Sequence, residues 1–130
     1  MSYTIKNLRE VEDMAPRFGF QEVQEARFAY RDLDAETIGM AFHRVKPSCR
    51  QGFAHRHHQA EEVYVVLSGS GRMKLDADVI DVGPMDAVRV APPVARAFEA
   101  GPEGIELLVF GPRHEKDGEV LQEDFWAETD

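Results

Sequence analysis

The pattern that most constrains the fold is the alternation of apolar and polar residues in short runs, each bounded by residues that favour turns. Such runs occupy residues 26–33, 37–46, 72–82, 86–92, 95–100 and 104–111, and residues 63–67 (VYVVL) are apolar throughout. Side chains of a β-strand point alternately to opposite faces, so this alternation predicts strands with one buried face. Turn-forming residues separate the runs, among them Pro47-Ser48, Gly83-Pro84, Gly101-Pro102 and the stretch 68–71 (SGSG). The sequence therefore predicts an all-β sandwich or barrel of roughly seven to nine short strands.

The length of 130 residues suits one domain with its own core. We expect a barrel over about residues 25–111, with an N-terminal segment, 1–24, and an acidic C-terminal extension, 112–130. The run 63–67 is apolar on both faces, so the barrel interior should cover one face, and a second sheet or a second subunit the other. An apolar cluster in the extension, which includes Trp126, should anchor onto the barrel or onto a partner chain. Both features predict a homodimer, although either could be covered within one chain.

Composition and charge narrow the classes of partner. The net charge of −9 argues against binding to nucleic acid or to an anionic membrane. No apolar run is long enough to cross a membrane, and the first residues lack the apolar core of a secretory signal. Together with the single cysteine, Cys49, these features predict a cytoplasmic protein. Residues 43–58 carry four cations and no acid, which favours either outward-facing side chains on strands or attraction of a small anionic molecule.

Three of the five histidines lie within residues 55–58, directly before two glutamates. On a strand, His55 and His57 would share one face, and a short turn would let Glu62 on the returning strand meet both imidazoles. A helix would instead pair residues four apart, but the β-branched run that follows makes a helix the poorer interpretation. Two imidazoles and a carboxylate suit a divalent transition metal such as Fe, Mn, Ni or Zn, and this set is also the facial arrangement of non-haem Fe(II) oxygenases.

This segment resembles the first motif of the cupin family, G-x5-H-x-H-x3,4-E-x6-G. The residues His55, His57, Glu62 and Gly69 match four of its five marked positions, and Cys49 stands at the opening glycine. Glu61 fits the shorter spacing, but only Glu62 keeps the six-residue step to the glycine. The resemblance implies a cupin-type jelly-roll barrel, also called a double-stranded β-helix, with short extensions at both ends and a metal held by His55, His57 and Glu62.

The second cupin motif, which normally supplies a histidine as fourth ligand, is degenerate. Its five marked positions fall on residues that do not match it: Met85, Ala91, Pro93, Arg96 and Ala100. Arg96 stands at the ligand position, and a guanidinium has no lone pair to give to a cation.

Three arrangements remain open at this point. Three ligands could hold the metal while Arg96 binds an anionic substrate; Arg96 could pair with Glu62 and leave a metal-free pocket; or His43 or His58 could complete the metal site.

Three functions follow from these alternatives, and the third is a structural dimer with a vestigial site. The first is a metal-dependent oxidoreductase or isomerase, with dioxygenase, isomerase or decarboxylase chemistry acting on a small anionic molecule. The second is a metal-free ligand-binding or sensory cupin in which Arg96 binds an anion without turnover. Besides Arg96, we expect two residues to contact the substrate. They are Tyr64, which shares the strand face of Glu62, and His43, on an earlier strand.

Overall fold

The chain is almost entirely β-structure in the computed structural model, which describes residues 2–121, 124–127 and 129. In chain order the elements are the 3-10 helix η1 (Leu8–Glu10), α1 (Ala15–Phe18), β1 (Gln24–Phe28), β2 (Ile38–Val45), β3 (His55–His57), β4 (Glu62–Leu75), β5 (Asp78–Val82), β6 (Ala87–Val90), β7 (Arg96–Pro112) and β8 (Gly118–Val120). The all-β prediction is confirmed. Over the described residues, neither helix is long and apolar enough to cross a membrane.

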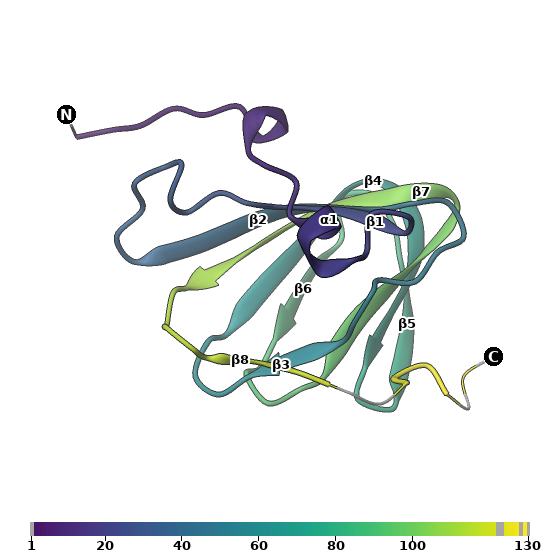
Figure 1. Cartoon of the computed structure of the whole chain (residues 1–130). Coiled ribbons are helices and arrows are strands. Elements are labelled where there is room, and N and C mark those ends of the chain that lie inside the picture. The colour runs from purple at the N-terminus through teal and green to yellow at the C-terminus, as the bar shows by residue number, and fades with distance from the viewer. Residues whose placement is uncertain (1, 122–123, 128, 130) are drawn as a thin grey trace.

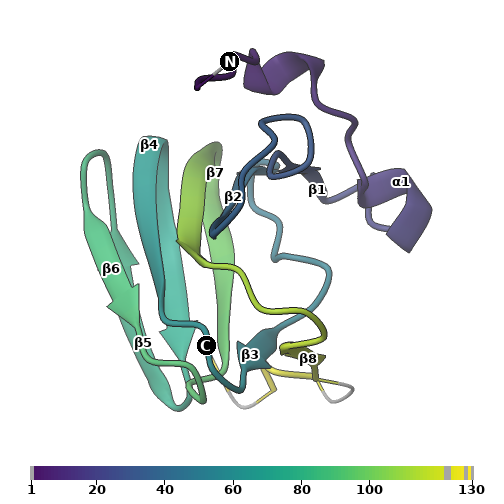
Figure 2. The same cartoon turned by 90° about the vertical axis from the view of Figure 1, so that its left-hand side faces the viewer.

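The strands form one antiparallel sheet that curls around the long strand β7 (Figure 1). Strand β4 pairs with β7 on one edge, and β2 and β3 pair with the other edge at opposite ends of β7. Strand β1 extends the sheet beyond β2, β8 extends it beyond β3, and β5 and β6 pair with β4. Figure 2 shows β1 and β2 above β3 and β8, with β4 and β7 standing to the left of both pairs.

Two predicted turns, at residues 68–71 and at Gly101-Pro102, are instead irregularities inside the long strands β4 and β7. The pairing of β4 with β7 shifts register near Gly69, and β7 carries extra residues up to Gly104 at the same level. Both glycines have a positive φ, 76° and 80°, which residues with a Cβ rarely adopt. A Cβ on Gly69 would also collide with the Gly104 carbonyl oxygen. The glycines therefore let the two strands bend and continue, where a turn would end them.

The core is built from the inward-facing positions of β2, β4 and β7. Its most completely buried apolar side chains include Val45, Val66, Met73, Phe98, Ile105 and Leu107. In the run 63–67, Tyr64 and Val66 point into this core, as the alternation requires. The other face is only half-buried at Val63 and Val65, and Leu67 is 43% exposed. The second apolar face of this strand is thus left partly uncovered within one chain.

The C-terminal extension packs against the barrel of its own chain. Strand β8 pairs with β3, and Trp126 is 5% exposed beside Ala54 and Ala97. The Lys74 ammonium donates to the Phe125 carbonyl oxygen at 2.8 Å, which ties the extension to β4. Of the anchors expected for the aromatic cluster, the barrel is the one observed. Part of the predicted acidic extension, residues 122–123, 128 and 130, lies outside the described residues.

Candidate metal centre

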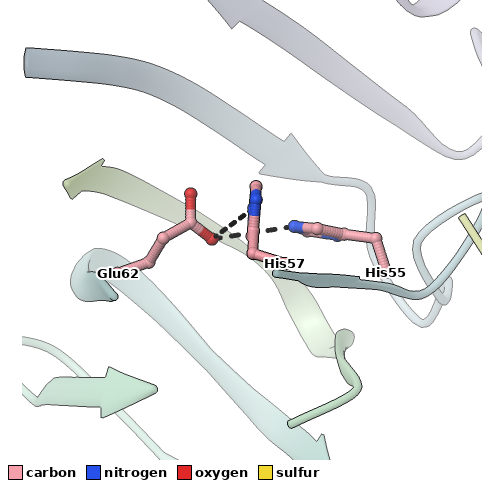
Figure 3. A group of neighbouring side chains, drawn as sticks. All are labelled: His55, His57 and Glu62. Carbon is pink, nitrogen blue, oxygen red and sulfur yellow. Dashed lines mark ion pairs between the residues drawn. The ribbon is translucent and has the colours of Figure 1, made fainter. Parts of the chain in front are cut away.

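His55, His57 and Glu62 meet at the inner face of the curled sheet (Figure 3). One potential ligand atom from each residue lies within 4.8 Å of the others. The Nε2 atoms of His57 and His55 are 3.3 Å and 3.7 Å from Oε1 of Glu62. Strand β3 presents both imidazoles on one face, and Glu62 opens β4 after a short loop, so the structure brings together the three residues expected from their spacing. The alternative Glu61 is exposed and pairs with Arg89 at 2.8 Å.

A fourth residue, Asp117 from the C-terminal extension, holds the loop between the two histidines and the glutamate. Its carboxylate accepts hydrogen bonds from the backbone N–H groups of Gln59 at 2.8 Å and Ala60 at 2.9 Å. It also lies 3.1 Å from Nδ1 of His57, and the residue is only 4% exposed. A carboxylate on the far nitrogen fixes the tautomer and direction of a ligating histidine. Sequence reasoning missed Asp117, because nothing local relates it to a histidine sixty residues earlier.

Burial and hydrogen bonds shift the pKa values of the ionisable groups in the cluster. Burial alone would raise the pKa of Glu62, but hydrogen bonds from His55 and His57 outweigh it and hold that pKa well below its usual range. The hydrogen bond to Glu62 raises the pKa of His57, whereas burial lowers the pKa of His55. Burial would raise the pKa of Asp117 as well, but its bonds from Ala60 and Gln59 lower it. Both carboxylates are therefore ionised near neutral pH and present negative oxygens to the cluster.

Arg96 lies behind Glu62. It is 1% exposed, and its Nη1 donates to Glu62 Oε1 at 3.0 Å. Its Nη2 donates to the carbonyl oxygens of Ala91 at 2.9 Å and Pro92 at 3.4 Å. Arg96 is absent from the described residues that line the adjacent cavity. This placement favours a role as a partner of Glu62 over the predicted role as a fork for substrate.

Tyr64 is a second hydrogen-bond partner of Glu62. Its hydroxyl donates to the same oxygen, Oε1, at 2.9 Å. Burial and the nearby Glu62 charge raise the pKa of Tyr64 well above its usual value, so the hydroxyl stays protonated and remains a donor. Tyr64 borders the cavity as expected for a substrate-binding residue, but its polar atom is already committed to the glutamate.

The donor set fits a divalent transition metal. Three ligand atoms about 2.1 Å from one ion, in tetrahedral or octahedral directions, lie roughly 3.0–3.5 Å apart. The two separations from Glu62 Oε1, 3.3 Å and 3.7 Å, approach that range. A carboxylate offers about four lone-pair sites, two on each oxygen, and Arg96 and Tyr64 already donate to Oε1, so a turn of the carboxylate would present Oε2 to an ion. The ion pair between Arg96 and Glu62 has therefore not moved the three candidate ligands apart.

Neither alternative histidine joins the three ligands. His58 is exposed on the loop after β3, and His43 lies on β2 outside the group of converging ligand atoms. His43 nevertheless lines the cavity, as expected for a substrate-binding residue. Burial, together with the nearby His55, lowers the pKa of His43 to about 4, so its imidazole is neutral at pH 7.

A cavity of about 350 Å³ opens directly onto the cluster. Its lining residues come from β1 and β2, from β3 and β8, and from β4 and β7. None of the four cations of residues 43–58 lines it. Three of them contact other groups of the chain, since Arg50 and Arg56 pair with glutamates and Lys46 donates to the Gln21 carbonyl oxygen. The basic stretch thus fits its first interpretation, outward-facing side chains.

Comparison with known proteins identifies relatives by structure alone. No family model and no curated protein sequence matches the chain. A cupin protein from Bacteroides fragilis superimposes with a TM-score of 0.69 at 20% identity, over 89% of this chain and 88% of that one. A polyketide cyclase from Streptomyces resistomycificus gives 0.74 at 19% identity, over 93% and 87%. A variant of oxalate decarboxylase from Bacillus subtilis gives 0.74 at 20% identity over 89% of this chain, which spans only 31% of that protein. At these identities the likeness establishes the fold.

Proposed function

Because this chain has the cupin fold, we propose that it holds a divalent metal ion on His55, His57 and Glu62 and acts on a small anionic molecule bound in the adjacent cavity. The observation that carries the proposal is the convergence of three potential ligand atoms within 4.8 Å at the end of a cavity. Two imidazoles and one carboxylate suit Fe, Mn, Ni or Zn, and three protein ligands leave positions at which a substrate can bind.

The chemistry supplied by such an ion is polarisation of a carbonyl, enolate or carboxylate oxygen. The residues of the chain determine what happens around it. Arg96 and Tyr64 hold the Glu62 carboxylate in place, and Asp117 holds His57. These contacts suit an oxidoreductase, isomerase or decarboxylase. The structural relatives include a polyketide cyclase and an oxalate decarboxylase, so the same fold serves several reactions.

The test is the metal content of protein purified without a polyhistidine tag, after incubation with Fe(II), Mn(II), Ni(II) or Zn(II) in turn. The wild-type protein should retain close to one ion per chain, and the His57→Ala variant should retain almost none. The matched control is His58→Ala, which removes the adjacent, exposed imidazole and should leave the metal content unchanged. Equal metal content in the wild-type protein and His57→Ala would refute the proposed site.

A metal-free binding protein is the second candidate, and one observation favours it. Arg96 already pairs with Glu62 through a 3.0 Å contact, so this glutamate has a positive partner without an ion. In this case the barrel would bind a small molecule without turnover. The metal measurement separates the two candidates, because this one requires that no ion be retained after incubation with any of the four metals.

We also propose that the protein is a homodimer. Phe42, Leu108 and Val65 lie side by side across β2, β7 and β4 on the outer face of the sheet, and the neighbouring Leu67 and Phe110 are 43% and 39% exposed. An apolar patch of this kind is typical of an interface. Light scattering should give a mass near twice 14.7 kDa. Phe110→Asp should halve the mass, and Val79→Asp, at a site on β5 that is 37% exposed, should not.

The cytoplasmic location remains a prediction that rests on the single Cys49, which forms no internal disulfide. Fractionation of cells that produce the protein tests it, and recovery outside the cytoplasmic fraction would contradict it.

A further inference from the structure

The walls of the cavity are lined by aromatic rings. The rings are contributed by the N-terminal segment, by β1 and the residues after it, and by the residues before β3, and they are Phe18, Phe20, Phe28, Tyr30 and Phe53. Phe18 and Phe28 are also 49% and 39% exposed. Exposed phenyl rings that line a cavity favour entry of an apolar molecule, since they are costly to leave in water unless a ligand covers them.

The rings form a continuous path to the metal centre. Phe20 lies 5.2 Å from Phe53 between ring centroids, Phe53 lies 6.1 Å from His55, and His55 lies 5.1 Å from His57. On β1 and β2, the rings of Phe28 and His43 pack nearly perpendicular to each other, with 5.6 Å between their centroids. A flat molecule placed between the two walls would contact aromatic rings along its length and reach the ligand cluster with one end.

The charge of the lining gives no advantage to a ligand with several negative charges. Among the lining residues that the structure describes, Arg113 is the only side chain with a permanent positive charge, and its guanidinium lies 4.3 Å from the centre of the Tyr30 ring. Glu62 and Asp117 add two carboxylates to the same lining, and the buried Arg96 pairs with Glu62 at 3.0 Å. The permanent charges therefore balance, and the protein offers no excess positive charge to a phosphate ester or a dicarboxylate.

His43 lines the cavity, and its ring carries a hydrogen-bonding atom that no described residue uses. Its Nδ1 is buried and has no hydrogen-bond partner among the described residues. A buried polar atom without a partner is unfavourable, so a turn of the ring that brings Nδ1 to the cavity would let a ligand pair with it. Since the ring is neutral at pH 7, it offers one donor and one acceptor, which suit a hydroxyl or a carbonyl group.

We propose that the natural ligand is a flat, mainly apolar molecule with aromatic character, which carries one oxygen-donor group toward His55, His57 and Glu62 and a second, uncharged polar group toward His43. The cavity of about 350 Å³ is near the lower end of the usual range for ligand pockets, so the ligand is compact, with about one or two rings. This inference rests on the proposed function for the role of the oxygen-donor group. The choice of an aromatic body rests on the walls alone.

The experiment is isothermal titration calorimetry with three probes: 3-hydroxy-2-naphthoate, oxalate and inorganic phosphate. Each is titrated into protein stripped of metal with a chelator and into protein loaded with Zn(II). The naphthoate should bind at least about tenfold more tightly than either small anion in both forms, because ring burial contributes more than 1.4 kcal/mol. Oxalate or phosphate binding as tightly as the naphthoate would overturn the proposal.

Variants separate the contribution of the cavity wall to naphthoate binding from general effects on the fold. Phe53→Ala should weaken naphthoate binding about tenfold, and Phe53→Leu, which keeps most of the volume, should weaken it less. Ile80→Ala removes an apolar side chain of β5 that is 37% exposed and outside the cavity lining, and should change nothing in naphthoate binding. At His43, Leu should weaken binding about fivefold, whereas Gln should preserve it by keeping a donor and an acceptor. Equal effects of Leu and Gln at this position would show that His43 does not pair with the ligand.

The outcome also distinguishes this inference from the proposed function. Tight naphthoate binding by protein that retains no metal would support the aromatic ligand class and refute the metal site. Retention of one metal ion per chain without preferential binding of the naphthoate would support the metal site and refute the aromatic ligand class.

Discussion

Arg96 stands where the resembled cupin motif carries its fourth ligand, and it faces His55 across the pair of strands β3 and β7. A histidine at this position would present a lone pair to the same cluster. We expect Arg96→His to bind Zn(II) at least about tenfold more tightly than Arg96→Leu, since both variants lose the guanidinium but only one gains a ligand. Competition with a fluorescent chelator measures the affinities, and equal values would mean that residue 96 does not face the ion.

His43 should make the protein sensitive to mild acid. Its pKa is about 4 in the folded chain and 6.5 when unfolded, so the unfolded chain binds the proton first as the pH falls. The free energy of unfolding should therefore decrease from pH 6.5 downward, by up to about 3 kcal/mol near pH 4. The charges that act on His43 are those of His55, Glu62 and Asp13, and the two acids offset part of the burial.

The measurement is urea unfolding of the wild-type protein and of His43→Gln at a series of pH values. The difference between their unfolding free energies should change in favour of the variant between pH 6.5 and 4. A difference that is independent of pH would show that His43 titrates normally in the folded protein.

Local spacing was enough to predict the three candidate ligands, and it could not predict what surrounds them. His55, His57 and Glu62 lie within eight residues, so strand geometry and one short loop determine their meeting. The partners of those ligands come from elsewhere, Arg96 from β7 and Asp117 from the extension. Contacts over such distances depend on how the strands are arranged, which one sequence does not reveal.

At the scale of elements, the bend shared by β4 and β7 depends on Gly69. We expect Gly69→Ala to lower the free energy of unfolding by about 2 kcal/mol or more, because the backbone is left-handed there and the new methyl group meets the Gly104 carbonyl. Gly83→Ala is the matched control, since its Cβ would have nothing within 4 Å and should change stability by about 0.5 kcal/mol or less. Urea unfolding measures both, and equal effects would exclude a special role for the bend.

Asp117 links the C-terminal extension to the candidate metal centre, so its loss should affect two properties at once. Asp117→Asn should lower metal affinity about 10- to 100-fold, as loss of the partner of a ligating histidine commonly does. It should also destabilise the loop at Gln59 and Ala60 by about 1–3 kcal/mol, because the amide offers one acceptor where the carboxylate offers two.

The control for this variant is Glu119→Gln, which neutralises a half-exposed carboxylate in β8 that lies 3.6 Å from Arg56. Metal titration and urea unfolding should leave this variant near the wild-type values. Loss of stability without loss of metal affinity in Asp117→Asn would limit Asp117 to a structural role.

The alternation of apolar and polar residues predicted most strands correctly. It failed where a glycine interrupts a strand and where a strand is too short to show the pattern. The segments 95–100 and 104–111 read as two strands, because Gly101 and Pro102 are ordinary turn residues. They are one strand, β7, because the extra residues are absorbed as an irregularity beside β4. Strand β8 has three residues, all exposed, so no apolar period marks it. Its pairing with β3 depends on the neighbouring contacts of Asp117 and Trp126.

At the scale of the whole molecule, the two ends of the chain complete a site whose ligands lie in the middle. Phe18 and Phe20 from the N-terminal segment and Asp117 and Val120 from the C-terminal one line the same cavity as His55. An ion bound to the three ligands would therefore connect the strands of the barrel with the extension that holds His57. Binding to the folded state alone should raise the stability of the whole domain.

We expect Zn(II) or Mn(II) at 100 times its dissociation constant to add about 2.7 kcal/mol to the free energy of unfolding. For a domain of 130 residues this corresponds to a rise in Tm of roughly 10 °C. Differential scanning calorimetry with and without the ion measures the shift, and a chelator should reverse it. His57→Ala should show almost no shift, and His58→Ala should match the wild-type protein. A shift of the same size in His57→Ala would assign the stabilisation to ions bound elsewhere, such as the acidic extension, and not to the histidine cluster.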